Sequence, residues 1–210
     1  MQDWNKKVKL NNKPFAKKGI AKHNMVFSKR LYVDKIGEVP QDPVELHLLY
    51  TQAKGCVLRG KYAVTDTEAL LLAALTLQIE YGDHNPEKHT AGFLRNELIK
   101  YIPKHLYGLQ KPEVWEKDFV STHIKMKGFT ELMSKQAYVK SCQKFRGYGY
   151  TFFQAKQTHL GKKEAKTIFL GVNVDGVAVF KTSDKSCYET YRFAKLKSWA
   201  ASQTQVTFKV

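Results

Sequence analysis

The hydrophobic pattern of this chain changes its period between Phe145 and Tyr150. Before that point, apolar residues recur at the three- and four-residue spacing of amphipathic helices. After it, they form short runs rich in aromatic and β-branched residues. The chain has 210 residues, 43% of them hydrophobic, and can therefore bury one or two cores. These features predict an α+β protein in which an all-α helical bundle is followed by an antiparallel β-sandwich.

Two helix starts in the first half carry strong capping signals. Asp42 is followed by a proline, as expected for an N-cap with proline at the first helical position. Thr65 lies three residues before Glu68, which is the spacing of a capping box. Two further helices fit residues 113–126 and 130–145, so the bundle should hold about five helices. The expected inner stripe of the last helix is Leu132, Met133, Ala137, Tyr138, Cys142 and Phe145.

The second half has the pattern of short strands separated by turns. The expected strands are Tyr150 to Lys156, Thr167 to Val172, Val177 to Phe180, Glu189 to Phe193, Leu196 to Ala201 and Thr204 to Val210. Asp175 and Gly176 form a hairpin signal between the second and third of these. Such a succession predicts an antiparallel meander folded into a sandwich or an open barrel. Because no closing element follows the last strand, the sandwich is expected to be incomplete at its C-terminus.

The charge is strongly basic, with a net value of +16. Residues 98–210 hold 20 basic and 8 acidic residues, so this part alone carries +12. Such a field attracts either an anionic membrane or nucleic acid. Aromatic residues such as Tyr148 and Phe152 could stack on bases, which keeps the nucleic-acid alternative open. The start of the chain lacks a signal-peptide core and no apolar run is long enough to span a bilayer, which favours a cytosolic protein.

Few residues indicate chemistry. His84 and His89 lie close together beside acidic residues, but no third histidine or cysteine pair accompanies them at ligand spacing. A capped loop is therefore expected there, and no metal. Cys56, Cys142 and Cys187 are odd in number and scattered, which is typical of reduced structural thiols. The chain has no phosphate-binding glycine motif and no nucleophile elbow, so neither enzymatic activity nor a cofactor is expected.

Five stretches of the sequence are distinctive: Asp42–Ala53, Gln78–Leu94, Tyr138–Lys140, Phe152–Phe153 and Leu196–Ser202. These stretches resemble the FERM family, and within it the heads of the talins. The likeness covers about residues 13–210, and the second of these stretches is rather specific to talins.

The resemblance implies three parts. Residues 1–41 would be a basic arm and the end of a ubiquitin-like first lobe. Residues 42–146 would be a helical second lobe like the acyl-CoA-binding proteins. Residues 147–210 would be a third lobe like the phosphotyrosine-binding and pleckstrin sandwiches, without its last strand and helix.

The resemblance also implies a peptide site. The third lobe of the family binds receptor tails, notably integrin β tails with an Asn-Pro-x-Tyr-type turn, by adding the peptide as a strand beside the fifth strand. The matching positions are Lys197, Ser198, Trp199, Ala200, Ala201 and Ser202. The small residues would let the peptide backbone approach, and Trp199 would pack either at the groove or in the core. Talin heads usually have arginine where this chain has Ser198.

A membrane site is implied in the same way. Talin-like heads lie on acidic phosphoinositide membranes through lysines of the second and third lobes. The corresponding candidates are Lys104, Lys125, Lys156, Lys162, Lys163 and Lys166. Each lysine near an anionic surface contributes about 1 kcal/mol, so about four or five would dock the head. The basic loop of residues 158–166 departs from the family at Glu164 and Ala165, where lysine and leucine are expected.

The function implied by the resemblance is that of a non-enzymatic adaptor on the inner face of the plasma membrane. It would couple phosphoinositides and an adhesion-receptor tail to the actin cytoskeleton, with the actin contacts outside this chain. Two alternatives stay open: a FERM module of the myosin-tail type that binds cargo, and a basic protein that binds nucleic acid.

Overall fold

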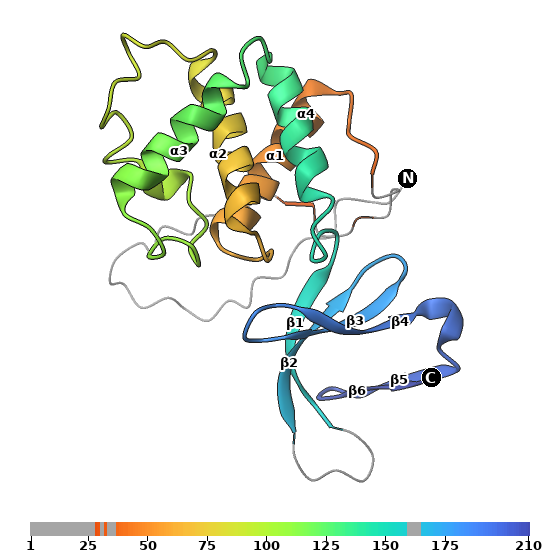
Figure 1. Ribbon diagram of the computed structural model, residues 1–210. Helices are drawn as coiled ribbons and strands as arrows, with labels where there is room; N and C mark the ends of the chain where they lie inside the picture. Colours follow the sequence, from red (N-terminus) through yellow and green to blue (C-terminus); the bar gives the residue numbers. More distant parts are fainter. Residues whose placement is uncertain (1–27, 30–31, 33–36, 159–164) are drawn as a thin grey trace, which may run out of the picture.

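The computed structural model describes residues 28–29, 32, 37–158 and 165–210. Most of the segment 1–41, interpreted above as the end of a first lobe, lies outside these residues. Figure 1 shows the helices gathered at one end of the molecule and the strands at the other. In the part of the chain that is described, no helix is both long and apolar enough to cross a bilayer.

The first two helices begin where their capping signals predicted. α1 (Pro43–Leu58) starts after Asp42, whose carboxylate accepts a hydrogen bond from the main-chain N–H of Glu45 at 2.7 Å. α2 (Asp66–Tyr81) starts after Thr65, whose hydroxyl accepts from the N–H of Glu68, while the Glu68 carboxylate accepts from the N–H of Thr65 at 2.8 Å. These caps satisfy main-chain donors that a first helical turn leaves free, and both predicted starts are confirmed.

Two more helices complete the bundle, α3 (Pro112–Ile124) and α4 (Glu131–Cys142), with the short 3₁₀ helix η1 (Leu98–Lys100) before them. α2 is the central helix, because it packs against both α3 and α4, while α1 packs on α4. Its buried residues are Ala69, Leu72, Ala73, Ala74, Leu75, Thr76, Leu77 and Gln78. Most of the apolar surface of α2 is thus enclosed by its neighbours, although Leu71 is 37% exposed.

The predicted inner stripe of α4 is partly wrong. Its later members are buried or partly buried, but Leu132 is 43% and Met133 46% exposed. With 3.6 residues per turn, these two positions lie roughly 120–140° from Tyr138 around the helix axis. They therefore lie away from the face that meets α1 and α2, and the first turns of α4 bury Ser134 and Lys135 instead.

The strands form two antiparallel sheets. The first holds, in chain order, β1 (Thr151–Gln157), β2 (Lys166–Val172), β3 (Gly176–Lys181) and β4 (Cys187–Arg192). The predicted hairpin joins β2 to β3: the Asn173 side chain accepts hydrogen bonds from the N–H groups of Asp175 and Gly176, each at 3.0 Å. The expected antiparallel meander is therefore confirmed for these strands.

The second sheet is a hairpin of β5 (Ser198–Ala201) and β6 (Val206–Lys209), reached from β4 through the short 3₁₀ helix η2 (Phe193–Lys195). In Figure 1 this hairpin lies on the side of the four-stranded sheet that is remote from the helices. The predicted strand after residue 188 was expected to include Phe193, which instead begins η2.

Candidate functional site

The edge of β5 is open on one side. Within the described residues, β5 pairs only with β6. The N–H of Ser202 donates to the carbonyl of Gln205 at 2.8 Å, so the main-chain groups of Ser202 face β6. Because main-chain groups alternate along a strand, the N–H and C=O of Trp199 and Ala201 face away from β6, toward the open edge. The edge therefore offers free donors and acceptors at every second residue.

The side chains of β5 are all exposed. Trp199 is 70% exposed and lies opposite Phe208 of β6 in the register. Of the two expected positions for Trp199, the groove or the core, the core is therefore not observed. Ala200 and Ala201 add no bulk beyond a methyl group on either face. The strand is therefore accessible both along its edge and on its faces, as the peptide site requires.

The flanking residues of the predicted peptide site have partners in the hairpin itself. The ammonium group of Lys197 donates to the carbonyl of Val210 at 3.2 Å. The hydroxyl of Ser202 accepts from the N–H groups of Thr204 and Gln205 at 3.3 and 3.1 Å. Ser202 therefore closes the turn, and Ser198 to Ala201 form the accessible part of the predicted site.

The candidate lysines of the helical bundle lie at its two ends. The N–H of Lys104 donates to the carbonyl of Leu58 at 2.9 Å, at the end of α1 and near the start of α2. Lys125 follows His123, whose ring contacts the carbonyl of Gly82 at 2.9 Å, just beyond the other end of α2. The 16 residues of α2 separate these ends by about 24 Å. Both lysines are exposed, but they do not form one cluster.

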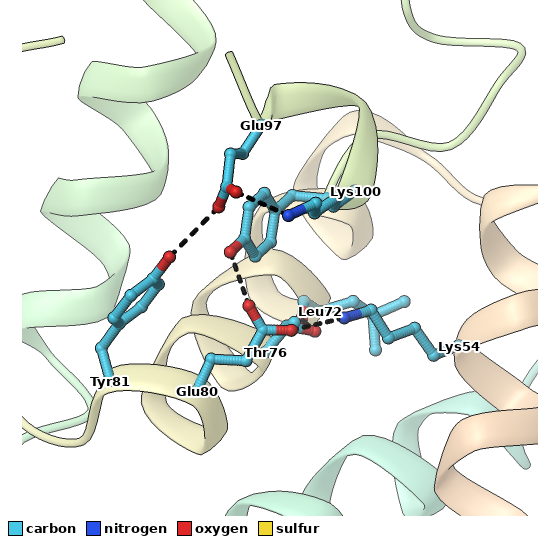
Figure 2. Close-up of polar contacts among 8 residues, drawn as sticks. Lys54, Leu72, Thr76, Glu80, Tyr81, Glu97 and Lys100 are labelled. Carbon is cyan, nitrogen blue, oxygen red and sulfur yellow. Dashed lines mark hydrogen bonds and ion pairs between the residues drawn. The ribbon is translucent and has the colours of Figure 1, made fainter. Parts of the chain in front are cut away.

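Two carboxylates tie the segment after α2 to the bundle (Figure 2). Glu80 accepts hydrogen bonds from the ammonium of Lys54 at 2.7 Å and from the hydroxyl of Tyr101 at 2.6 Å. Glu97 accepts from the hydroxyl of Tyr81 at 3.3 Å. Burial, together with the Glu80 carboxylate, raises the pKa of Tyr101, so its hydroxyl stays a donor. This network fixes the chain just before the first candidate lysine.

The candidate lysines of the sheet lie near the end of the β1–β2 hairpin. Lys156 opposes Thr167 in the register, and Gln157 opposes Lys166. Directly opposed residues share a face and successive residues alternate, so the side chains of Lys156 and Lys166 leave opposite faces of the sheet. Both residues are exposed. The remaining two candidates, Lys162 and Lys163, lie outside the described residues.

Three histidines meet at the loop that follows α2. The rings of His84 and His89 are 5.3 Å apart, and that of His123, from α3, lies 6.0 and 5.9 Å from them. The sequence paired only the first two, because His123 is more than 30 residues away along the chain. Among the described residues, no three side chains of metal-ligand type are placed to hold an ion. The Nδ1 atom of His89 accepts a hydrogen bond from the N–H of Asn85, which agrees with the capped loop that was expected.

This histidine cluster should make stability depend on pH. Burial, then the nearby His84 and Lys88, lower the pKa of His89 below its ordinary value of 6.5. Burial likewise lowers the pKa of His123, against the opposing hydrogen bond to Gly82. Because these pKa values are lower in the folded state, the histidines of the unfolded chain take up protons at a higher pH. The stability is therefore complete above pH 6.5 and falls as the pH drops through the folded-state pKa values.

We expect the melting temperature to fall between pH 7 and pH 5, as measured by circular dichroism. The fall should be smaller in a His89→Gln variant, because only His123 of the two shifted histidines remains. His47→Gln, at an exposed position on α1, serves as the control and should keep the full fall. An identical pH profile for wild type and His89→Gln would contradict the role of the cluster.

Comparison with known proteins supports the resemblance noted from the sequence. The FERM central domain matches residues 35–153. Talin-A of Dictyostelium discoideum is 33% identical over 198 residues, covering 94% of this chain and 15% of that protein. Talin-1 of Gallus gallus is 34% identical over 167 residues, covering 80% of this chain and 6% of that protein. The chain thus spans a small part of the relatives it matches.

A solved structure shares the fold. The human Myosin 7b C-terminal MyTH4-FERM domain, in complex with the harmonin-a PDZ3 domain, matches with a TM-score of 0.69 over 86% of this chain and 37% of that chain. At 24% identity this likeness shows the fold alone. Since the FERM central domain spans more than half of the 210 residues and the talins align over most of them, the chain belongs to the FERM family and is similar to the talins within it.

Proposed function

We propose that this chain is a non-enzymatic talin-like adaptor that binds the cytoplasmic tail of an adhesion receptor at β5. The observation that carries the proposal is the open edge of β5, with free main-chain groups at Trp199 and Ala201. An extended peptide would add there as a further strand, and each hydrogen bond would contribute about 0.5–1.5 kcal/mol. Trp199, at 70% exposure, would supply the apolar contact beside the peptide.

The adaptor would work at the inner face of the plasma membrane. Its tail ligand, an integrin-β-like peptide with an Asn-Pro-x-Tyr-type turn, would link through this chain to actin-binding regions elsewhere in a longer protein. The similarity to talins, which extends along 94% of the chain for Talin-A, supports this role.

Substitution of Ala200 tests the peptide site. Ala200→Arg should weaken binding of a fluorescent Asn-Pro-x-Tyr tail peptide at least tenfold, measured by anisotropy, because a long charged side chain would stand where the peptide approaches. Ala201→Pro should act similarly, because it removes an N–H that faces the open edge. The control is Ala194→Arg, an exposed alanine of η2. Unchanged tail affinity in Ala200→Arg would refute the assignment of the peptide to β5.

We also propose that exposed lysines of both halves hold the chain on acidic phosphoinositide membranes. The candidates are Lys104, Lys125, Lys156, Lys162, Lys163 and Lys166. The side chains of Lys156 and Lys166 leave opposite faces of the sheet, so a single membrane surface would not meet both. Each described lysine that faces the bilayer should contribute on its own, about 1 kcal/mol. The net charge of +16 favours the same kind of surface.

Sedimentation with vesicles tests the membrane proposal. Lys104→Gln should lower the partition coefficient onto phosphoinositide vesicles about fivefold, and adding Lys156→Gln should lower it about fivefold again, following the contribution of each lysine. Lys140→Gln, at an exposed position of α4, is the control and should change little. Tighter binding to DNA than to these vesicles at physiological salt would overturn the proposal and favour the nucleic-acid alternative.

A further inference from the structure

A cavity of about 800 Å³ lies between the helices and the four-stranded sheet. One wall is formed by the second half of α1 and by the α1–α2 loop, including Lys61. The other wall is formed by β1, by parts of β2 and β3, and by the β3–β4 turn, which includes Lys185. The connection that contains Arg146 lines it between the walls. We name this cavity the helix–sheet cleft. Its volume is in the range of about 300–1,000 Å³ that is typical of ligand sites.

The floor of the helix–sheet cleft is aromatic. The rings of Phe152 and Phe180 are 5.0 Å apart in an edge-to-face arrangement. Gly171 makes room for this floor, since a Cβ atom there would lie 2.8 Å from the rings of Phe180 and Tyr150. Phe169, which lies opposite Phe180 in the register and so on the same face, also lines the cleft, and both Phe152 and Phe169 are partly exposed. The cleft therefore presents apolar surface to solvent that a large apolar side chain could cover.

The rim of the cleft is cationic. Lys61, Lys144, Arg146 and Lys185 line it, and none of them forms an ion pair with another described residue. The two carboxylates in the lining are already engaged. Glu68 belongs to the capping box of α2, and Asp184 accepts hydrogen bonds from the N–H and hydroxyl of Ser186 at 2.9 and 2.8 Å. With Lys29, the lining holds five basic and two acidic side chains, so the cleft carries a net positive charge.

Lys185 is held in an unusual backbone conformation. Its φ angle is +57°, and among the described residues it is the one non-glycine residue with a positive φ. Its ammonium group donates a hydrogen bond to the carbonyl of Gly60 across the cleft. Burial and the nearby Lys61 lower the pKa of Lys185, as expected when a second cation lies near a partly buried ammonium group. A positive φ is uncommon for a residue other than glycine, and residues held in such conformations cluster at active sites and ligand clamps.

We propose that the helix–sheet cleft binds an acidic peptide segment that places one large apolar side chain on the aromatic floor. The cations stand on both walls and on the connection between them, so they suit carboxylates spread along an extended chain. The aromatic floor suits an apolar side chain. The headgroup of a phosphoinositide has no apolar group that could cover this floor. Aromatic residues and arginine are also the types enriched at protein-binding surfaces. This site is separate from the edge of β5.

The test uses the whole 210-residue chain and labelled octapeptides of aspartate and glutamate. One peptide carries a central phenylalanine, a second carries alanine there, and a third replaces the acids by lysine. Fluorescence anisotropy should show binding of the first, at least fivefold weaker binding of the second, and none of the third. Equal affinity for the first two peptides, or no binding of the first, would overturn the proposal.

Variants of the protein locate the peptide. Lys185→Gly removes the cation and suits the positive φ, so the variant should fold and yet bind the phenylalanine peptide at least fivefold more weakly. Arg146→Gln should have a similar effect. Lys181→Gln, at an exposed position of the same hairpin outside the cleft, is the matched control. Loss of binding to phosphoinositide vesicles in Lys185→Gly, with the peptide affinity unchanged, would assign the cleft to lipid and refute the proposal.

Discussion

Replacing Phe119 by alanine is expected to lower the free energy of unfolding by about 3–5 kcal/mol, the range for a large aromatic side chain lost from a core. Phe119 lies on α3 and is fully buried, with ring centroids 5.5 Å from Trp115 and 6.5 Å from Tyr101. It thereby joins α3 to the segment that holds Lys104. Since a domain is stable by only about 5–15 kcal/mol, this loss is a large share of the total.

Urea denaturation followed by far-ultraviolet circular dichroism measures this effect. Val114→Ala is a suitable control, because Val114 lies on the same helix and is 43% exposed, and its loss should change stability by about 0.5 kcal/mol or less. A loss below about 1 kcal/mol for Phe119→Ala would contradict the packing described for α3.

The second large effect is expected at Glu116. This carboxylate is buried and accepts hydrogen bonds from the main-chain N–H groups of Gly92 and Leu94 at 2.8 and 3.2 Å. Glu116→Ala leaves both donors without this acceptor. The loss costs about 1–3 kcal/mol at Leu94, which is buried, and less at Gly92, which is exposed to water. Glu116→Gln keeps an acceptor oxygen and should lose less.

Hydrogen exchange tests this prediction at the residues concerned. The amides of Gly92 and Leu94 should lose protection in Glu116→Ala, whereas amides inside α1 should lose protection only to the extent that global stability falls. Lys117→Ala, at the neighbouring exposed position, serves as the control. Unchanged protection of both loop amides would show that Glu116 does not hold this loop.

The sequence predicted those features of the fold that depend on neighbours a few residues apart. The caps at Asp42 and Thr65 and the hairpin at Asp175 are formed by hydrogen bonds between residues two or three positions apart, so their patterns suffice. The burial of Leu132 and Met133 was predicted wrongly, because the face that α4 presents depends on where α1 and α2 lie.

The sites show the same limit. The peptide strand was proposed through resemblance to the FERM family, and the sequence alone left Trp199 between core and groove. The exposure of Trp199 depends on what covers β5, which no local pattern contains. The meeting of His123 with His84, and of Lys185 with Gly60, joins residues 39 and 125 positions apart. Such contacts arise from packing between elements and leave no periodic signal.

The contrast between two tryptophans provides a built-in optical reporter. Trp115 is 1% exposed within the bundle, whereas Trp199 is 70% exposed on β5. In a Trp4→Phe background, the emission of Trp115 should shift to longer wavelength only when the bundle unfolds. The emission of Trp199 should shift to shorter wavelength when a peptide covers the strand. A single fluorescence spectrum can therefore distinguish occupancy of β5 from loss of the fold, without any attached dye.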